Sequence, residues 1–203
     1  VVLIMRKIHL GYHQSLKNKK ILIIGANSSL AKEVVKIIDK SKFLITKIYK
    51  SELNFNKNYK SSKIKKIIKY TKPDIIVNFI GKFSLNHKAN QNILLSNILP
   101  TWELIKYFQT NSPNRPIKII ILGSSSYKSP RKKYMLYAAT KSALNSLCKS
   151  AEEYFVDSKV SIKIYNPSTF GGKHLGRFAK KSNININLGQ KKFINILIKL
   201  FKI

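Results

Sequence analysis

The chain has 203 residues, and 44% of its side chains are hydrophobic. This length and composition suit one domain with a sizeable core and exclude a disordered chain. The formal net charge is +31, but the lysines are spread over nearly every segment, and no basic block alternates with aromatic residues. We therefore interpret the charge as a solvated surface and expect no specific nucleic-acid binding.

Cysteine use and the two ends of the chain bear on its location. The single cysteine, Cys148, cannot form an intramolecular disulfide, and no cluster of Cys and His has the spacing of metal ligands. We therefore expect a cytoplasmic protein without a metal site. Residues 1–5 are apolar but too short to cross a membrane. Residues 191–203 alternate Lys with apolar side chains at helical spacing, and we expect this helix to pack on its own domain rather than on a membrane.

The first predicted elements are a strand, a tight turn and a helix. Residues 1–19 show no firm periodicity and are interpreted as a leader. Residues 20–25 are a continuous apolar run that ends in Gly25, which predicts a strand buried on both faces of a sheet. Residues 30–38 follow with apolar side chains at helical spacing.

The same alternation continues along the chain. Further strands are predicted at residues 43–50, 75–79, 117–122 and 160–165. Further helices are predicted at residues 57–70, 91–108 and 136–155, with Pro100 as a kink or a helix start in the second of them. Strands that alternate with helices predict an α/β fold, a doubly wound, Rossmann-like parallel sheet with helices on both faces.

Residues 25–31, Gly-Ala-Asn-Ser-Ser-Leu-Ala, lie between the first strand and the first helix, where a doubly wound fold binds a dinucleotide. Such a loop needs small residues, so that backbone N–H groups and the helix N-terminus can approach the pyrophosphate. Only Gly25 remains of the usual glycines, but Ser28 or Ser29 and then Ala31 keep the loop small. The loop is thus a candidate nucleotide site.

Tyr137 and Lys141 are four residues apart inside a predicted helix, so their side chains share one helix face. A lysine near a phenol favours the anionic form and would lower its pKa. We therefore expect Tyr137 to donate or accept a proton near neutral pH.

From residue 20 to residue 167 the chain resembles the short-chain dehydrogenase/reductase family. Five features carry the resemblance, and they occur in the family's order. They are the glycine loop, residues 78–81 (Asn-Phe-Ile-Gly), Asn97, the serines at 124–126, and Tyr137 with Lys141. Residues 47–55 and 72–75 are more similar to the extended branch that modifies nucleotide sugars, especially dehydrorhamnose reductases, whereas residues 137–144 are more similar to the classical branch. The subfamily therefore stays open.

The resemblance implies a role for each matching residue. Tyr137 would be the acid or base, Lys141 would hold the nicotinamide ribose, and Asn97 would hold a proton-relay water. The catalytic serine would be Ser124 by the family's spacing or Ser125 by the order of its paired serines. The residues that would bind the cofactor are Gly25, Asn27, Ser28, Ser29, Leu30, Lys50, Asn54, Asn78, Gly81, Lys141, Pro167 and Thr169.

The choice of cofactor depends on the end of the second strand. A carboxylate there would bind the ribose hydroxyls of NAD, whereas a cation would favour the extra phosphate of NADP. Lys50 stands at this end and the first acid is Glu52, so we expect NADP, with NAD as the alternative.

We therefore expect an oxidoreductase that moves a hydride between NADP and a small-molecule carbonyl or alcohol, which can belong to a sugar. The alternatives are a nucleotide-sugar epimerase or reductase, and a non-catalytic binding protein that keeps the fold. The classical branch also implies a homodimer formed through helices 91–108 and 136–155. We divide the chain into a leader (1–19), an NAD(P)-binding domain (20–170) and a short C-terminal segment with the amphipathic helix (171–203). We expect the substrate lobe to be reduced or absent.

Overall fold

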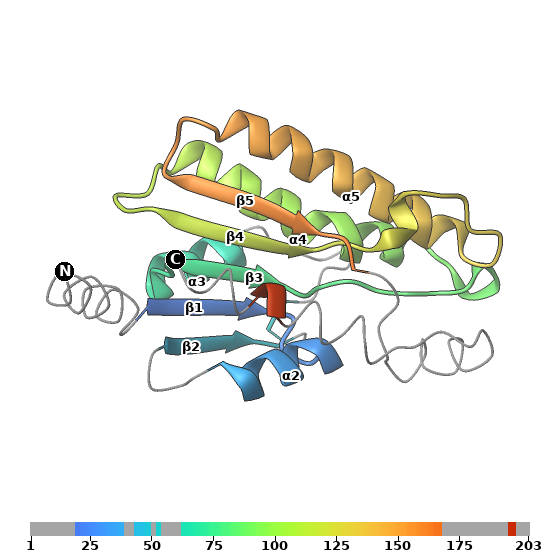
Figure 1. The fold of residues 1–203 in the computed structure, drawn as a ribbon, viewed down its shortest axis with the longest axis horizontal. Helices are drawn as coiled ribbons and strands as arrows, with labels where there is room; N and C mark the ends of the chain where they lie inside the picture. Colours follow the sequence, from blue (N-terminus) through green and yellow to red (C-terminus); the bar gives the residue numbers. More distant parts are fainter. Residues whose placement is uncertain (1–18, 39–42, 50–51, 54–61, 168–194, 198–203) are drawn as a thin grey trace, which may run out of the picture.

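The core of the protein is a five-stranded sheet. The computed structural model describes residues 19–38, 43–49, 52–53, 62–167 and 195–197. The strands are β1 (Lys19–Ile24), β2 (Phe43–Ile48), β3 (Ile75–Asn78), β4 (Ile117–Leu122) and β5 (Val160–Tyr165). They are all parallel, in the order β2-β1-β3-β4-β5, and Figure 1 shows their arrowheads at the same end.

Helices connect the strands. They are α2 (Ser29–Ile37), α3 (Ser62–Thr71), α4 (Asn92–Thr110) and α5 (Met135–Tyr154), with short 3-10 turns η1 (Asn86–Lys88) and η2 (Ser125–Tyr127). All five predicted strands and the four predicted helices before residue 156 are therefore confirmed as elements. Pro100 lies inside α4 and is buried there. Residues 1–18 of the predicted leader and nearly all of the C-terminal helix lie outside the described residues, whereas Lys19, the last residue assigned to the leader, begins β1.

Two hydrophobic cores cover the two faces of the sheet. The first packs side chains of α3, α4 and α5 against one face, and the second packs α2 and Leu197 against the other. Ile21 and Ile23 point into the second core, while Leu22 and Ile24 point into the first, because successive side chains of a strand alternate between its faces. The doubly wound α/β arrangement predicted from the sequence is thus confirmed.

The order of the strands determines where a ligand can bind. The chain leaves β1 toward β2 on one side, then returns through α3 to place β3 on the other side of β1. The connection from β1 runs to β2 on one side, and the connection from β3 runs to β4 on the other side. The two connections therefore diverge at the carboxyl ends of β1 and β3, which is where open α/β sheets form their binding crevice. Gly25 directly follows β1, and residues 79–81 directly follow β3, so both predicted loops border this crevice.

Candidate active site

Gly25 begins the loop between β1 and α2. Its φ is +82°, which a side chain would strain, and its N–H donates to the carbonyl of Ile48 at 3.0 Å. A Cβ on Gly25 would lie only 3.0 Å from the backbone nitrogen of Ile80. The loop after β1 and the loop after β3 therefore touch at the crevice, and glycine is required at the point of contact.

The rest of this loop begins α2. The Ser28 hydroxyl accepts the N–H of Ala31 at 3.0 Å and so caps the helix. Asn27 and Ser29 are exposed, whereas the side chain of Leu30 is buried in the core. Leu30 can therefore offer a ligand only its backbone N–H, one of the first-turn donors that have no partner within a helix.

Asn78 and Asn97 shape the loop after β3. The Asn78 amide donates to the Thr101 hydroxyl at 3.2 Å and accepts the N–H of Ile80 at 3.0 Å. The Asn97 amide accepts the N–H of Lys82 at 2.6 Å and donates to the carbonyl of the same residue at 3.1 Å. Both asparagines are almost fully buried, so their side chains hold the loop in place.

Lys141 lies across the carboxyl ends of β3 and β4. Its Nζ donates to the carbonyl of Leu122 at 3.0 Å, and a Cβ on Gly81 would lie 3.3 Å from that nitrogen. The side chain is fully buried, and burial lowers the pKa of its ammonium from 10.5 to about 8. Lys141 therefore remains a cation at neutral pH, but it holds its proton less tightly than an exposed lysine does.

Tyr137 stands one turn before Lys141 on α5. Its ring packs edge to face against Phe83 at 5.0 Å between centroids and against Tyr134 at 6.0 Å. Burial raises the pKa of the phenol, a hydrogen bond with Ser124 lowers it, and the neighbouring Tyr134 raises it, with burial the largest effect. The phenol therefore stays protonated at neutral pH.

This raised pKa corrects one prediction. The sequence-based expectation that Lys141 lowers the pKa of the Tyr137 phenol toward neutrality is wrong in this structure. The lysine nitrogen is 5.9 Å from the centre of the tyrosine ring, and the largest effect on the phenol pKa is the removal of the phenol from water. Spacing along a helix indicates which side chains are neighbours, but it does not indicate how deeply they are buried.

The two candidate serines differ in their contacts. Ser124 lowers the pKa of the Tyr137 phenol, and its hydroxyl lies 3.1 Å from the hydroxyl of Ser126. Ser125 begins η2, and its backbone N–H donates to the carbonyl of Pro167 at 2.9 Å. The structure therefore brings Ser124, rather than Ser125, together with Tyr137.

Sequence reasoning missed several residues that support this arrangement. Thr140 donates to the carbonyl of Tyr137 at 2.7 Å and accepts from Asn97 at 2.8 Å, so it links α4 to the catalytic turn of α5. Phe83 and Tyr134 enclose the phenol ring. A threonine before the lysine is a weak signal, and nothing in the spacing of Phe83 indicates its place. Of the predicted cofactor residues, Lys50, Asn54 and Thr169 lie outside the described residues.

The described loops fit a dinucleotide. Gly25 lets the loop after β3 approach the loop after β1, and the first turn of α2 contains no acidic residue that would repel a pyrophosphate. Gly81 lets the Lys141 ammonium lie close to the loop after β3, because a Cβ there would be only 3.3 Å from the lysine nitrogen. The residues that would hold the cofactor are therefore these two glycines, the backbone N–H groups of the first turn of α2, and Lys141.

The family of the chain follows from a comparison with protein-family models. The model described as "NAD dependent epimerase/dehydratase family" matches residues 21–198, which is most of the chain. The chain belongs to this family. The matched residues begin within β1 and include both loops at the crevice, the serines and the Tyr137–Lys141 pair. A comparison with curated protein sequences gave no match.

Solved structures of short-chain dehydrogenases share the fold of this family member. An aldohexose dehydrogenase of Thermoplasma acidophilum in ligand-free form has a TM-score of 0.66 at 15% identity, over 88% of this chain and 77% of that chain. A short-chain dehydrogenase family protein of Francisella tularensis has a TM-score of 0.63 at 16% identity, over 87% and 81%. ElxO with NADP bound has a TM-score of 0.65 at 19% identity, over 83% and 80%. The predicted resemblance to the short-chain dehydrogenase/reductase fold is confirmed.

In the part of the chain that the structure describes, no helix is long and apolar enough to cross a bilayer. The same residues contain no group of three His, Cys, Asp or Glu side chains that could hold a metal ion.

Proposed function

We propose that this protein is an oxidoreductase that transfers a hydride between NADP and a carbonyl or alcohol. The observation that carries the proposal is the meeting of the Tyr137 phenol, the Ser124 hydroxyl and the Lys141 ammonium beside the crevice of the sheet. A proton donor, a hydrogen-bonding hydroxyl and a cation are the groups that carbonyl reduction requires.

The nicotinamide, when bound, supplies or accepts the hydride. Tyr137 is protonated at neutral pH, so it is ready to donate its proton to the oxygen of a carbonyl as that oxygen gains negative charge. Ser124 is beside the phenol and is placed to hydrogen-bond the same oxygen. These two residues favour the direction of carbonyl reduction in this protonation state.

Lys141 supports the proton transfer through its charge. After Tyr137 donates its proton, a phenolate remains in a buried site, where an unpaired anion is costly. The Lys141 nitrogen, 5.9 Å from the ring centroid, is the cation that stabilises this phenolate. Its carbonyl partner, Leu122, is the last residue of β4 and fixes the position of the charge.

Binding and turnover measurements test the proposal. We expect NADPH to bind, as measured by its fluorescence on titration, and to bind more tightly than NADH. We expect NADPH to be oxidised in the presence of at least one compound from a panel of aldehydes, ketones and keto-sugars. A failure of both dinucleotides to bind at millimolar concentration would instead support a non-catalytic protein that keeps the fold.

A second candidate is a nucleotide-sugar epimerase or reductase, and the family model is compatible with it. The same tyrosine, serine and lysine would serve a sugar hydroxyl that is first oxidised or a keto-sugar that is reduced. A panel of sugar nucleotides separates the two candidates. Turnover of sugar nucleotides but not of simple carbonyls would favour the second, and the reverse result would favour the first.

A further inference from the structure

We propose that Asn145 and Asn166 are positioning residues that hold Ser124 against Tyr137. This inference rests on the proposed function, because it concerns the geometry of the same site. Neither asparagine belongs to the motifs that identified the site, and both are partly buried.

The turn that carries Ser124 is tied to the segment that follows β5. The N–H groups of residues 123, 124 and 125 donate, in order, to the Tyr165 carbonyl, the Asn166 side chain and the Pro167 carbonyl, at 2.7, 3.0 and 2.9 Å. Two of these bonds join backbone to backbone, and the middle one depends on a side chain. The position of Ser124 therefore depends directly on the orientation of the Asn166 amide.

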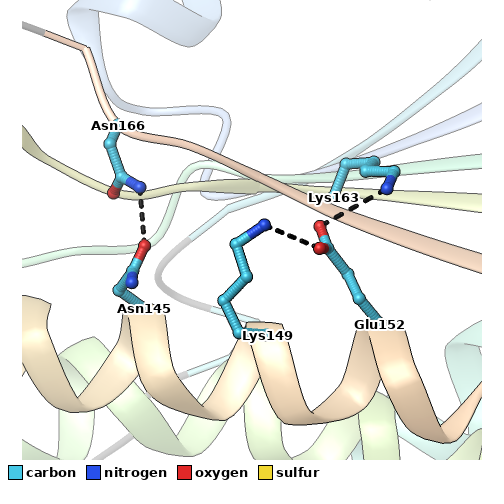
Figure 2. A network of polar contacts seen from close by, with 5 residues as sticks. All are labelled: Asn145, Lys149, Glu152, Lys163 and Asn166. Atoms are coloured by element: carbon cyan, nitrogen blue, oxygen red, sulfur yellow. Dashed lines mark hydrogen bonds and ion pairs between the residues drawn. The ribbon is translucent and has the colours of Figure 1, made fainter.

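The polarity of this contact fixes the orientation of both amides. A backbone N–H can only donate, so the atom of Asn166 that faces Ser124 must be Oδ1. The Nδ2 of Asn166 is then left to donate, and it does so to Oδ1 of Asn145 at 2.7 Å (Figure 2). Asn145 therefore acts as a hydrogen-bond acceptor that keeps the Asn166 amide from turning over.

Gly123 leaves the space that this arrangement requires. A Cβ at this position would lie 1.9 Å from Oδ1 of Asn166, which no pair of atoms tolerates. Glycine therefore allows the amide to lie directly against the serine turn. The closeness of the contact also means that a small rotation of Asn166 would move the backbone of Ser124.

The contacts close a circuit around the catalytic pair. Helix α5 carries both Tyr137 and Asn145, eight residues apart, and Asn145 binds Asn166, which binds the Ser124 N–H. The circuit ends at Tyr137, because Ser124 acts on the pKa of its phenol. Because the helix is rigid over these two turns, the amide pair sets the serine at a constant place relative to the phenol.

Helix α5 makes a second contact with β5, but of a different kind. Glu152 pairs with Lys149 on its own helix at 2.7 Å and with Lys163 of β5 at 3.7 Å (Figure 2). Both lysines are largely exposed, so water and salt weaken these pairs. The amide pair, in contrast, connects α5 to the segment after β5 that binds the serine turn.

The substitution Asn145→Leu tests the inference, because leucine removes the acceptor while keeping a similar volume. Asn145→Asp is the conservative variant, since a carboxylate still accepts from Asn166. The matched control is Asn111→Leu at the end of α4. It removes the hydrogen bonds from Asn111 Nδ2 to the Tyr107 carbonyl and the Thr110 hydroxyl, both 2.8 Å long, before the amino end of β4, whereas the serine turn follows the carboxyl end of that strand.

We expect Asn145→Leu to lower kcat about 100-fold, the effect of a small misplacement of a reacting group, with little change in NADPH affinity. We expect Asn145→Asp to restore most of the rate and Asn111→Leu to retain it. Equal rates for Asn145→Leu and Asn111→Leu, or equal losses for the Leu and Asp variants at position 145, would overturn the inference. The proposed function would stand in that case, because it needs only turnover by the wild type.

A titration of the Tyr137 phenol reads the same geometry without turnover. Ser124 lowers the pKa of this phenol and Tyr134 raises it, and the Lys141 nitrogen lies 5.9 Å from the centre of the ring. Since Ser124 lowers the phenol pKa, we expect Asn145→Leu to raise that pKa. The measurement is the ultraviolet absorbance of tyrosinate as pH rises, from which the spectrum of a reference protein that also carries Tyr137→Phe is subtracted. An unchanged phenol pKa would overturn the positioning role even if the wild type proves inactive.

Discussion

At the scale of single residues, burial decides the protonation of the catalytic pair. Burial lowers the pKa of the Lys141 ammonium to about 8 and raises the pKa of the Tyr137 phenol above its ordinary value of 10.0. The two shifts have the same cause, the loss of water around the charged form. Near neutral pH the site therefore contains a cation and a neutral acid, which is the state in which it can protonate a carbonyl oxygen.

The buried lysine makes a prediction about stability. Because its folded pKa is about 8 and its ordinary value is 10.5, the unfolded chain binds this proton more strongly, so the lysine destabilises the folded protein most at low pH. The cost, ~3 kcal/mol, is relieved as pH rises between these two values. We expect Lys141→Met to have a larger free energy of unfolding in urea than the wild type at pH 7, and we expect this difference to shrink by pH 10. A difference that does not change with pH would contradict the shift.

The two serines give a second prediction at this scale. Ser124→Ala removes the hydroxyl beside Tyr137, and we expect kcat to fall 10²–10³-fold, about the effect of one lost donor to a developing oxyanion. Ser125→Ala leaves the backbone bond to Pro167 in place, so we expect its rate to stay near that of the wild type. Steady-state kinetics of the two variants side by side decides between them. The opposite ranking would assign the catalytic role to Ser125.

At the scale of elements, the site depends on two loops that touch. Gly25 adopts a φ of +82°, and alanine there would bring a Cβ within 3.0 Å of the Ile80 backbone. We expect Gly25→Ala to lower the free energy of unfolding by about 1–2 kcal/mol or more and to weaken NADPH binding. Urea unfolding and fluorescence titration measure the two effects. Unchanged NADPH affinity would show that the loop does not contact the cofactor.

The elements themselves were largely readable from the sequence. The predicted ranges for β4 and β5 are those observed, because each is a short run with apolar side chains at its buried positions. The strand predicted at 43–50 ends at Ile48, since β2 is an edge strand whose pattern is less apolar. The four helices were found by their periodicity, and the observed ends of α2, α4 and α5 lie within two residues of the predicted ends.

The candidate site was readable in part. Spacing placed Tyr137 and Lys141 on one helix face and gave the order of the other motifs. It could not choose between Ser124 and Ser125, because that choice depends on a contact between β4 and α5. The bond between Asn145 and Asn166 spans 21 residues and two elements, so no local pattern indicates it.

In the whole molecule, the residues of the candidate site lie together at the carboxyl ends of the central strands. Gly25, Gly81, Ser124 and Lys141 follow or face the carboxyl ends of β1, β3 and β4, which lie side by side. The site therefore needs the complete doubly wound order, in which strands distant in sequence become neighbours.

The packed pair α4 and α5 gives a prediction about assembly. Trp102 on α4 is 40% exposed and Leu94 is 41% exposed, and we expect these helices to form a homodimer. Analytical ultracentrifugation should then give a dimer for the wild type. We expect Trp102→Glu to shift it toward the monomer, because a carboxylate would be buried in an apolar contact. A wild type that sediments as a monomer would remove this proposal and leave the site unaffected.

The central claim is that Tyr137 transfers the proton in an NADP-dependent reaction. Its most direct test is NADPH oxidation by the Tyr137→Phe variant, compared with the wild type on the same substrate. We expect the variant to bind NADPH with wild-type affinity, since only the hydroxyl is lost, and to turn over at least about 10²-fold more slowly. Wild-type turnover by Tyr137→Phe would contradict the claim.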